Sequence, residues 1–136
     1  MPGSEESKVL FDTYAWIEYF RGSEEGEVVK KYIESDFEVL TPTIVLAELS
    51  DKYRRIGKGV QWEDDRREIV ELRSRIVTLS SDSADGAGML KKEMRKEYGD
   101  YPLSDGMIMC IAKESGCKVL TGDKHMRESE ETMNLK

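Results

Sequence analysis

Short apolar runs alternate along this chain with longer stretches in which apolar residues recur at helical spacing. The short runs are rich in valine, isoleucine and leucine and are bounded by polar or turn-forming residues, so they are interpreted as buried strands. The first of them ends at Asp12. The expected strands cover residues 8–12, 37–40, 76–79 and 119–120, with a last edge strand near 133–135.

The stretches between these strands predict amphipathic helices. Thr41 and Pro42 are suited to be the cap and the first helical residue of one of them, and Ser104 is suited to cap another. The segment Gly57-Lys58-Gly59 is expected to end the helix that carries Glu48. The expected helices cover residues 14–20, 24–35, 42–56, 63–74, a long helix capped by 81–83, and a helix from 104 to Gly116.

Strands that alternate with helices of this length predict an α/β fold with a mainly parallel sheet. We expect a three-layer α/β/α sandwich around a central sheet of four or five strands. The 136 residues suffice for one domain, and no linker or repeat divides them. Residues 1–7 are polar and are expected to be flexible, without the features of a signal peptide. No apolar run has membrane-spanning length, so a cytoplasmic protein is expected.

Composition narrows the range of functions. The chain carries 28 acidic and 21 basic residues, a net charge of −7, which argues against a broadly basic nucleic-acid binder. A nuclease stays possible, because metal-binding carboxylates add to the negative total. The two cysteines, Cys110 and Cys117, fall in a predicted helix and just past its end, which predicts free thiols without a disulfide or zinc site.

Four carboxylates hold positions where an α/β fold would gather them. Asp12 and Asp123 follow predicted strands, and Glu48 and Asp105 lie at or near the starts of predicted helices. In an open parallel sheet, ligands bind beyond the carboxyl ends of the strands, where these helices also begin. A cluster of acids is costly without a cation, so a hard divalent cation with oxygen ligands is expected there.

The same residues resemble those of the PIN-domain ribonuclease family. The resemblance rests on Asp12-Thr13 after the first strand, on residues 41–49 around Glu48, and on residues 103–125, which hold Asp105 and Asp123. It extends over nearly the whole chain, and the small size is most similar to the VapC-type toxins of toxin–antitoxin pairs. Gly106, where the family often has alanine, and Met126, where an aromatic residue is usual, depart from the family pattern. Gly106 is expected to loosen its helix slightly.

The resemblance implies an endoribonuclease that uses Mg²⁺ or Mn²⁺ to activate a water against an RNA phosphodiester bond. Asp12 and Asp105 would bind the first ion directly, and Glu48 and Asp123 would complete the site through waters or a second ion. Thr13 and Thr121 would orient a water or a carboxylate, or serve only as structural residues. The resemblance also implies a homodimer and a small antitoxin protein as partner.

The basic cluster and the aromatic residues each allow two interpretations. Lys52, Arg54, Arg55 and Lys58 either steer RNA phosphates toward the acids or complement the dipole at a helix C-terminus. The aromatic residues of the first helix either join the core or line a groove for a partner helix. Trp62 is expected to be the exposed one, because charged residues surround it in the sequence. A dimer interface is accordingly expected on the first two helices or near Trp62.

Two other protein classes with similar strand ends are disfavoured, because this chain lacks acids that they need. A haloacid-dehalogenase-like phosphatase needs a second aspartate two residues after Asp12, where this chain has Tyr14. A response-regulator receiver needs an aspartate at the end of its third strand, where this chain has Leu79-Ser80-Ser81. The remaining alternative is a PIN-like module that binds RNA or protein without cutting. The four intact acids count against it.

Overall fold

The computed structural model describes residues 7–122 and the backbone of residues 132–134. Most of the terminal segment expected to be flexible therefore lies outside the described residues, and so do Asp123 and Met126. Five parallel strands form one sheet in the order β3-β2-β1-β4-β5, which confirms the predicted α/β fold with a parallel sheet. The strands are β1 (Lys8–Phe11), β2 (Glu38–Pro42), β3 (Arg75–Val77), β4 (Lys118–Thr121) and β5 (Thr132–Asn134).

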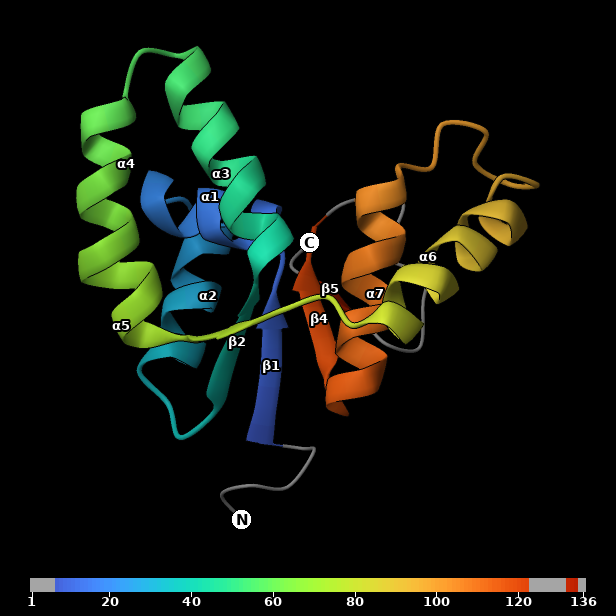
Figure 1. The fold of residues 1–136 in the computed structure, drawn as a ribbon. Coiled ribbons are helices and arrows are strands. Elements are labelled where there is room, and N and C mark those ends of the chain that lie inside the picture. Colours follow the sequence, from blue (N-terminus) through green and yellow to red (C-terminus); the bar gives the residue numbers. More distant parts are fainter. Residues whose placement is uncertain (1–6, 123–131, 135–136) are drawn as a thin grey trace.

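Helices cover both sides of this sheet. Figure 1 shows α1 to α5 gathered on one side of the strands and α6 and α7 on the other, which is the expected three-layer arrangement. The predicted helix 63–74 corresponds to three consecutive elements, α4, the π-helix η2 (Arg66–Val70) and α5. The first of these begins at Gly59, earlier than expected. The helices are α1 (Thr13–Arg21), α2 (Glu24–Ile33), α3 (Thr43–Arg55), α4 (Gly59–Asp65), α5 (Glu71–Arg73), α6 (Ser81–Met94) and α7 (Leu103–Ser115).

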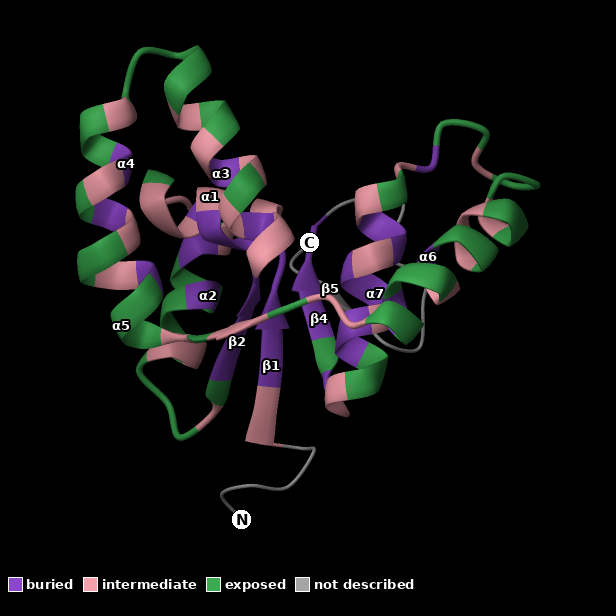
Figure 2. Ribbon diagram, viewed as in Figure 1, coloured by how far each residue is buried: buried purple, intermediate pink, exposed green. Residues whose placement is uncertain are grey.

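The core lies between the central strands and the inner helices. Val9, Leu10 and Phe11 of β1 have no exposed surface, and Figure 2 shows the same burial in the neighbouring strands. Trp16 of α1 is also fully buried and packs edge-on against Phe11, with ring centroids 5.1 Å apart. Trp16 therefore belongs to the core and is not available to line a partner groove, while Tyr19 and Phe20 are half-buried and pack against that core.

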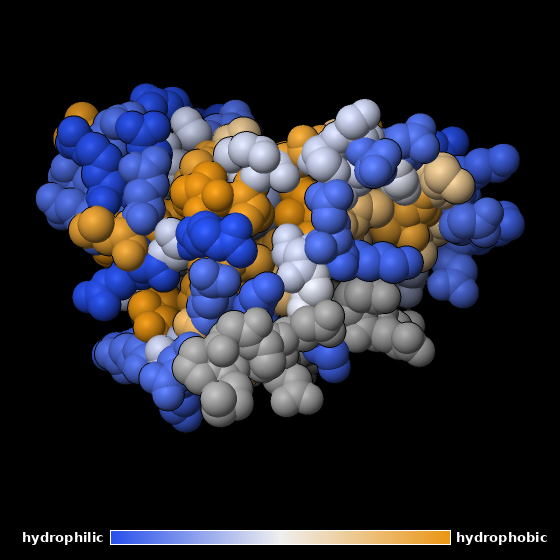
Figure 3. All heavy atoms as spheres, turned by 60° about the horizontal axis from the view of Figure 1, so that its bottom comes forward, coloured by the Kyte–Doolittle hydropathy of each residue, from blue (hydrophilic) through white to orange (hydrophobic). Residues whose placement is uncertain are grey.

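Trp62 is buried, and the expectation that it is exposed was wrong. Only 2% of its surface is accessible, and its ring lies 5.3 Å from that of Tyr53. The charged neighbours in the sequence misled the prediction, because two of them are paired with α3: Asp65 accepts a hydrogen bond from the Tyr53 hydroxyl at 2.9 Å, and Glu63 pairs with Arg54 at 2.9 Å. Figure 3 shows hydrophilic side chains at both margins of the molecule, on the sides of α4–α5 and of α6. Trp62 itself therefore offers no surface to a partner, while the dimer interface expected near it stays a prediction.

The start of α3 also differs from the prediction. Thr41 and Pro42 belong to β2, and Pro42 is the N-cap residue of α3 without a side-chain cap. The Thr41 hydroxyl instead accepts a hydrogen bond from Trp16 Nε1 at 3.0 Å and lies 2.7 Å from Ser74 Oγ. A buried indole N–H needs an acceptor, and this tertiary demand takes precedence over local capping.

Two further helices begin earlier than their serines suggested. Ser80 caps α6 by accepting a hydrogen bond from the Ser83 backbone at 3.1 Å, one residue before the predicted cap. Helix α7 begins at Leu103 after Pro102, so Ser104 lies inside the first turn and is not the cap. In both cases the helix begins one or two residues earlier than predicted. The ends of a helix are defined only to within one or two residues, so a shift of this size is expected.

Both cysteines are free thiols, as predicted. Cys117 is buried, and burial raises the pKa of its thiol to about 11. Burial also raises the pKa of Cys110. Since the thiolate is the reactive form, both side chains are protonated and unreactive at neutral pH.

Gly106 lies where α7 crosses α6. A Cβ atom at this position would stand 3.0 Å from the Ala87 carbonyl oxygen, tighter than most real contacts. Gly88 lies on the solvent side of α6, and a Cβ there would meet no atom within 4 Å. Gly106 is therefore a packing requirement of this helix pair as well as a departure from the family pattern.

These two glycines give a matched test. Gly88→Ala is expected to raise the free energy of unfolding by about 1 kcal/mol, the usual gain from alanine in a helix interior. Gly106→Ala is expected to lower it, because overpacking costs about 1–3 kcal/mol and exceeds that gain. Denaturant unfolding of both variants measures the difference. An equal gain at both sites would contradict the close packing of α6 on α7.

Candidate functional site

The order of the strands places a crevice between β1 and β4. The chain adds β2 and β3 on one side of β1 and then crosses to add β4 and β5 on the other. Ligand sites in open parallel sheets lie at such a reversal, beyond the carboxyl ends of the strands. Phe11 pairs with Leu120 in the register of β1 and β4, so Asp12 and Thr121 follow side by side at this edge.

Three of the predicted acids reach this crevice from three different helices. Asp12 is the N-cap of α1, and its Oδ1 accepts a hydrogen bond from the Ala15 backbone at 2.8 Å. Asp105 lies in the first turn of α7. Glu48 lies in the second turn of α3, and its Oε1 accepts a hydrogen bond from the Thr13 hydroxyl at 2.5 Å. The Thr13 hydroxyl thereby fixes the orientation of the Glu48 carboxylate.

Asp12, Glu48 and Asp105 line one cavity of about 240 Å³. Asp12 is 3% and Asp105 8% exposed, while Glu48 is half-buried. Burying a carboxylate in a protein interior costs free energy unless polar groups compensate. Two helix N-termini supply such compensation here, because Asp12 caps α1 and Asp105 lies in the first turn of α7, where the helix dipole is positive. The fold thus maintains buried acids at this position.

The donor set consists of carboxylate and hydroxyl oxygens, the ligands that hard divalent cations prefer. Among residues 7–122, no three acidic, histidine or cysteine side chains stand close enough together to hold one ion. Mg²⁺ typically uses one or two protein carboxylates and completes its shell with waters and substrate oxygens. The residues present fit that mode of binding, in which Asp12 and Asp105 were expected to bind the ion directly.

The remaining predicted site residues are placed as follows. Thr121 is fully buried at the end of β4, beside the crevice. Asp123, two residues further on, lies outside the described residues. Neither the role of Thr121 nor that of Asp123 is tested by the structure, and both stay predictions.

The apolar wall of this cavity was not predicted from the sequence. Tyr14, Ile17 and Ile108 complete its lining. In the sequence, Tyr14 was noted only because it is not an aspartate, and Ile108 was not singled out. A signal was present in the spacing. Ile108 lies three residues after Asp105 and Ile17 three after Tyr14, so each pair shares one helix face.

The basic cluster lies further along α3 than Glu48. Lys52 is one turn beyond it and Arg55 nearly two turns, about 6 and 10 Å along the helix axis at 1.5 Å per residue. Arg54 pairs with Glu63 at 2.9 Å and Arg55 with Asp51 at 3.0 Å, and all of these side chains are largely exposed. Exposed pairs of this kind contribute little to stability. A contact of Lys52, Arg54, Arg55 or Lys58 with RNA stays a prediction.

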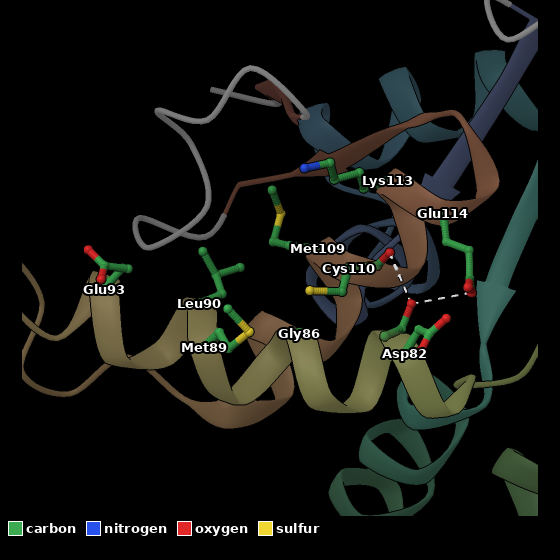
Figure 4. A pocket seen from close by; sticks show the side chains of 10 residues that line it. Asp82, Gly86, Met89, Leu90, Glu93, Met109, Cys110, Lys113 and Glu114 are labelled. Carbon is green, nitrogen blue, oxygen red and sulfur yellow. Dashed lines mark hydrogen bonds between the residues drawn. The ribbon is translucent and has the colours of Figure 1, made fainter.

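A second, larger cavity of about 560 Å³ lies between α6 and α7. Figure 4 shows Met89, Leu90 and Met109 lining the middle of this space. Near one end, Ser83 donates hydrogen bonds to the Cys110 carbonyl oxygen at 3.3 Å and to Glu114 at 3.2 Å. It shares no lining residue with the acidic cavity. Its lining is mainly apolar, and Figure 4 shows Glu93 at the end opposite to Asp82 and Glu114. The cavity that gathers Asp12, Glu48 and Asp105 is therefore the candidate active site.

Residues 9–131 match the family model of the PIN domain. The chain belongs to the PIN domain family. The matched range contains all four acids, Asp12, Glu48, Asp105 and Asp123. The family resemblance inferred from the residues is thus confirmed, while the individual role of each acid is not tested by the match.

Solved structures show the same PIN fold. A toxin–antitoxin complex from Klebsiella pneumoniae is 21% identical with a TM-score of 0.70, covering 94% of this chain and 98% of that chain. VapBC2 from Rickettsia felis, bound to promoter DNA, is 17% identical with a TM-score of 0.74, covering 93% and 98%. VapC20 from Mycobacterium tuberculosis, a sarcin-ricin loop cleaving toxin, is 16% identical with a TM-score of 0.66, covering 85% and 91%.

At these identities the likeness shows the fold alone. Among curated proteins, none matches the chain. Within the part of the chain that the structure describes, no helix has both the length and the apolar character needed to cross a membrane.

Proposed function

We propose that this PIN domain is a divalent-metal-dependent endoribonuclease and the toxin of a toxin–antitoxin pair. The observation that carries the proposal is the convergence of Asp12, Glu48 and Asp105 in one cavity at the reversal point of a PIN fold. The description of VapC20 as a toxin that cleaves the sarcin-ricin loop supports RNA as the substrate.

The acidic residues have distinct parts in this proposal. Asp12 and Asp105 hold Mg²⁺ or Mn²⁺ directly, and Glu48 and Asp123 complete the site. A bound divalent ion supplies Lewis acidity to phosphate oxygens and to a nearby water. The hydroxyl of Thr13 keeps Glu48 in one orientation toward the cavity. In the net reaction a water oxygen bonds to phosphorus, the bond to one ribose oxygen breaks, and a proton from the water ends on that leaving oxygen.

Chelation tests the proposal directly. The purified protein is expected to cut RNA in Mn²⁺ or Mg²⁺, to lose this activity in excess chelator, and to regain it when Mn²⁺ is restored. Gel analysis of a labelled RNA measures the cut. Cleavage that persists in chelator would exclude the metal mechanism. A complete absence of cleavage under all conditions would favour the alternative, a non-catalytic PIN-like module that binds RNA or protein.

The proposed partner is a small antitoxin protein, supported by the neighbours that are toxin–antitoxin complexes. A cationic side chain from such a partner would suit the acidic cavity. The homodimer, with its interface on the first two helices or near Trp62, stays a prediction. The cytoplasmic location also stays a prediction.

A further inference from the structure

The lining of the acidic cavity combines acidic and apolar side chains, and α1 and α7 each contribute to both kinds. On α7, Asp105 lies in the first turn and Ile108 one turn further along. On α1, Asp12 caps the helix, and Tyr14 and Ile17 follow on one face. The cavity is therefore lined by acids that come from three helices and by apolar side chains of α1 and α7.

Tyr14 is the aromatic residue of this wall, and its ring has a defined position. A Cβ atom on Gly122 would stand 2.7 Å from Tyr14 Cζ, closer than real Cβ atoms approach. The ring therefore covers the backbone of Gly122, which follows β4. Since Tyr14 follows β1, the ring bridges the crevice between the two strands where the acids gather. Only glycine at 122 leaves room for the ring in this position.

A nucleotide combines a charged phosphate with an apolar base face, and these two groups suit the acidic and the apolar side chains of this cavity. Its phosphate is the group that a carboxylate-bound cation attracts, and its base has two π-faces that stack on aromatic side chains whatever the sequence. Proteins that recognise single-stranded RNA use tyrosine in this way. The net charge of −7 makes a nonpolar contact more valuable here, because the surface as a whole repels RNA.

We propose that Tyr14, held by Gly122, stacks one base of the RNA next to the cleaved phosphodiester bond and so helps to position that bond over the acids. The inference rests on the proposed function and deepens it, because it names the residue that binds the base. Tyr14 is a binding residue in this account and takes no part in proton transfer.

The test uses a short single-stranded RNA whose cleaved bond has been mapped. Versions of it lack the base at one position on either side of that bond. For the wild type, removal of one particular base is expected to raise KM about tenfold, the scale of one base–aromatic stack. Tyr14→Leu is expected to raise KM on the intact RNA by a similar factor and to become insensitive to the missing base. Tyr14→Phe, which keeps the ring, is expected to retain that sensitivity.

A matched control removes a comparable tyrosine elsewhere. Tyr32 is half-buried on α2, packs against Phe37 with centroids 5.1 Å apart, and does not line the cavity. Tyr32→Leu is expected to leave KM and base sensitivity unchanged. Thermal melts of all variants establish that each is folded. A Tyr14→Leu variant with wild-type KM, or one that still senses the missing base, would overturn the assignment.

Binding of the same labelled RNA, followed by fluorescence anisotropy in Mn²⁺, separates the two proposals. If RNA is cut but Tyr14→Leu matches the wild type, the stacking role is wrong and the ribonuclease proposal stands. If RNA is not cut but Tyr14→Leu weakens binding about tenfold while Tyr32→Leu does not, the stacking role stands and the ribonuclease proposal is wrong. If the RNA is neither cut nor bound, both are wrong.

Discussion

Asp12→Asn is expected to lower the rate of RNA cleavage at least about a hundredfold, the usual scale for losing one electrostatic group of an active site. Asparagine keeps the shape of aspartate and an oxygen that accepts the hydrogen bond from the Ala15 backbone, so the cap of α1 stays. The substitution removes the negative charge that would hold the cation. The rate of cleavage of labelled RNA in Mn²⁺ measures the loss of activity, and a thermal melt shows whether the variant keeps its stability.

Two further variants show whether the loss of activity comes from the charge of Asp12 itself. Asp12→Ala removes the cap as well as the charge, so it should lose activity and also about 1 kcal/mol of stability. Asp82→Asn changes an exposed aspartate in the first turn of α6, far from the acidic cavity in the fold, and should leave cleavage unchanged. Wild-type cleavage by Asp12→Asn would remove Asp12 from the site. An equal loss in Asp82→Asn would point to a general effect of net charge.

The second large effect is the stabilisation of the wild type by divalent metal. A ligand that binds only the folded protein stabilises it by about 2.7 kcal/mol when its concentration is one hundred times the dissociation constant. Asp105→Asn is expected to lose most of this gain while staying folded, because the amide keeps the size of the buried Asp105 side chain and removes its charge. Thermal melts over a series of Mn²⁺ concentrations measure the shift for both proteins.

The exposed Asp85 on α6 provides the control, and Asp85→Asn should keep the full metal-induced shift. A wild-type protein whose melting temperature does not change up to several millimolar Mn²⁺ would mean that the three acids form no pre-organised metal site. The non-catalytic PIN-like alternative would then be preferred. A shift that survives in Asp105→Asn would place the ion away from α7.

Much of the fold follows from local patterns. The apolar runs that became β1 and β4 are buried from end to end except for their first residues, and such runs are characteristic of a parallel sheet covered on both faces. Asp12, Glu48 and Asp105 were also identified from their places after a strand or near a helix start. That reasoning succeeds because parallel strands end, and their following helices begin, at one common edge of the sheet.

Other features depend on partners that are remote in sequence. Thr41 resembles a helix cap but serves the buried indole of Trp16, 25 residues earlier. Trp62 has charged neighbours but packs against Tyr53 on the adjacent helix. Gly106 resembles a weak helix residue, and only the approach of Ala87 shows why a side chain is excluded there. In each case the local conformational preference contributes about 1 kcal/mol to stability. The free energy of burying or packing the side chain is larger and decides the structure.

The sequence by itself determined the succession of strands and helices along the chain, the parallel sheet and the approach of Asp12, Glu48 and Asp105 to one edge of that sheet. Tertiary structure alone decided that Thr13 orients Glu48 across 35 residues and that Tyr14 closes over Gly122 to give the acidic cavity an apolar wall. The physical reason is that periodicity records which face of an element is buried, whereas it contains nothing about which remote side chain or backbone meets that face.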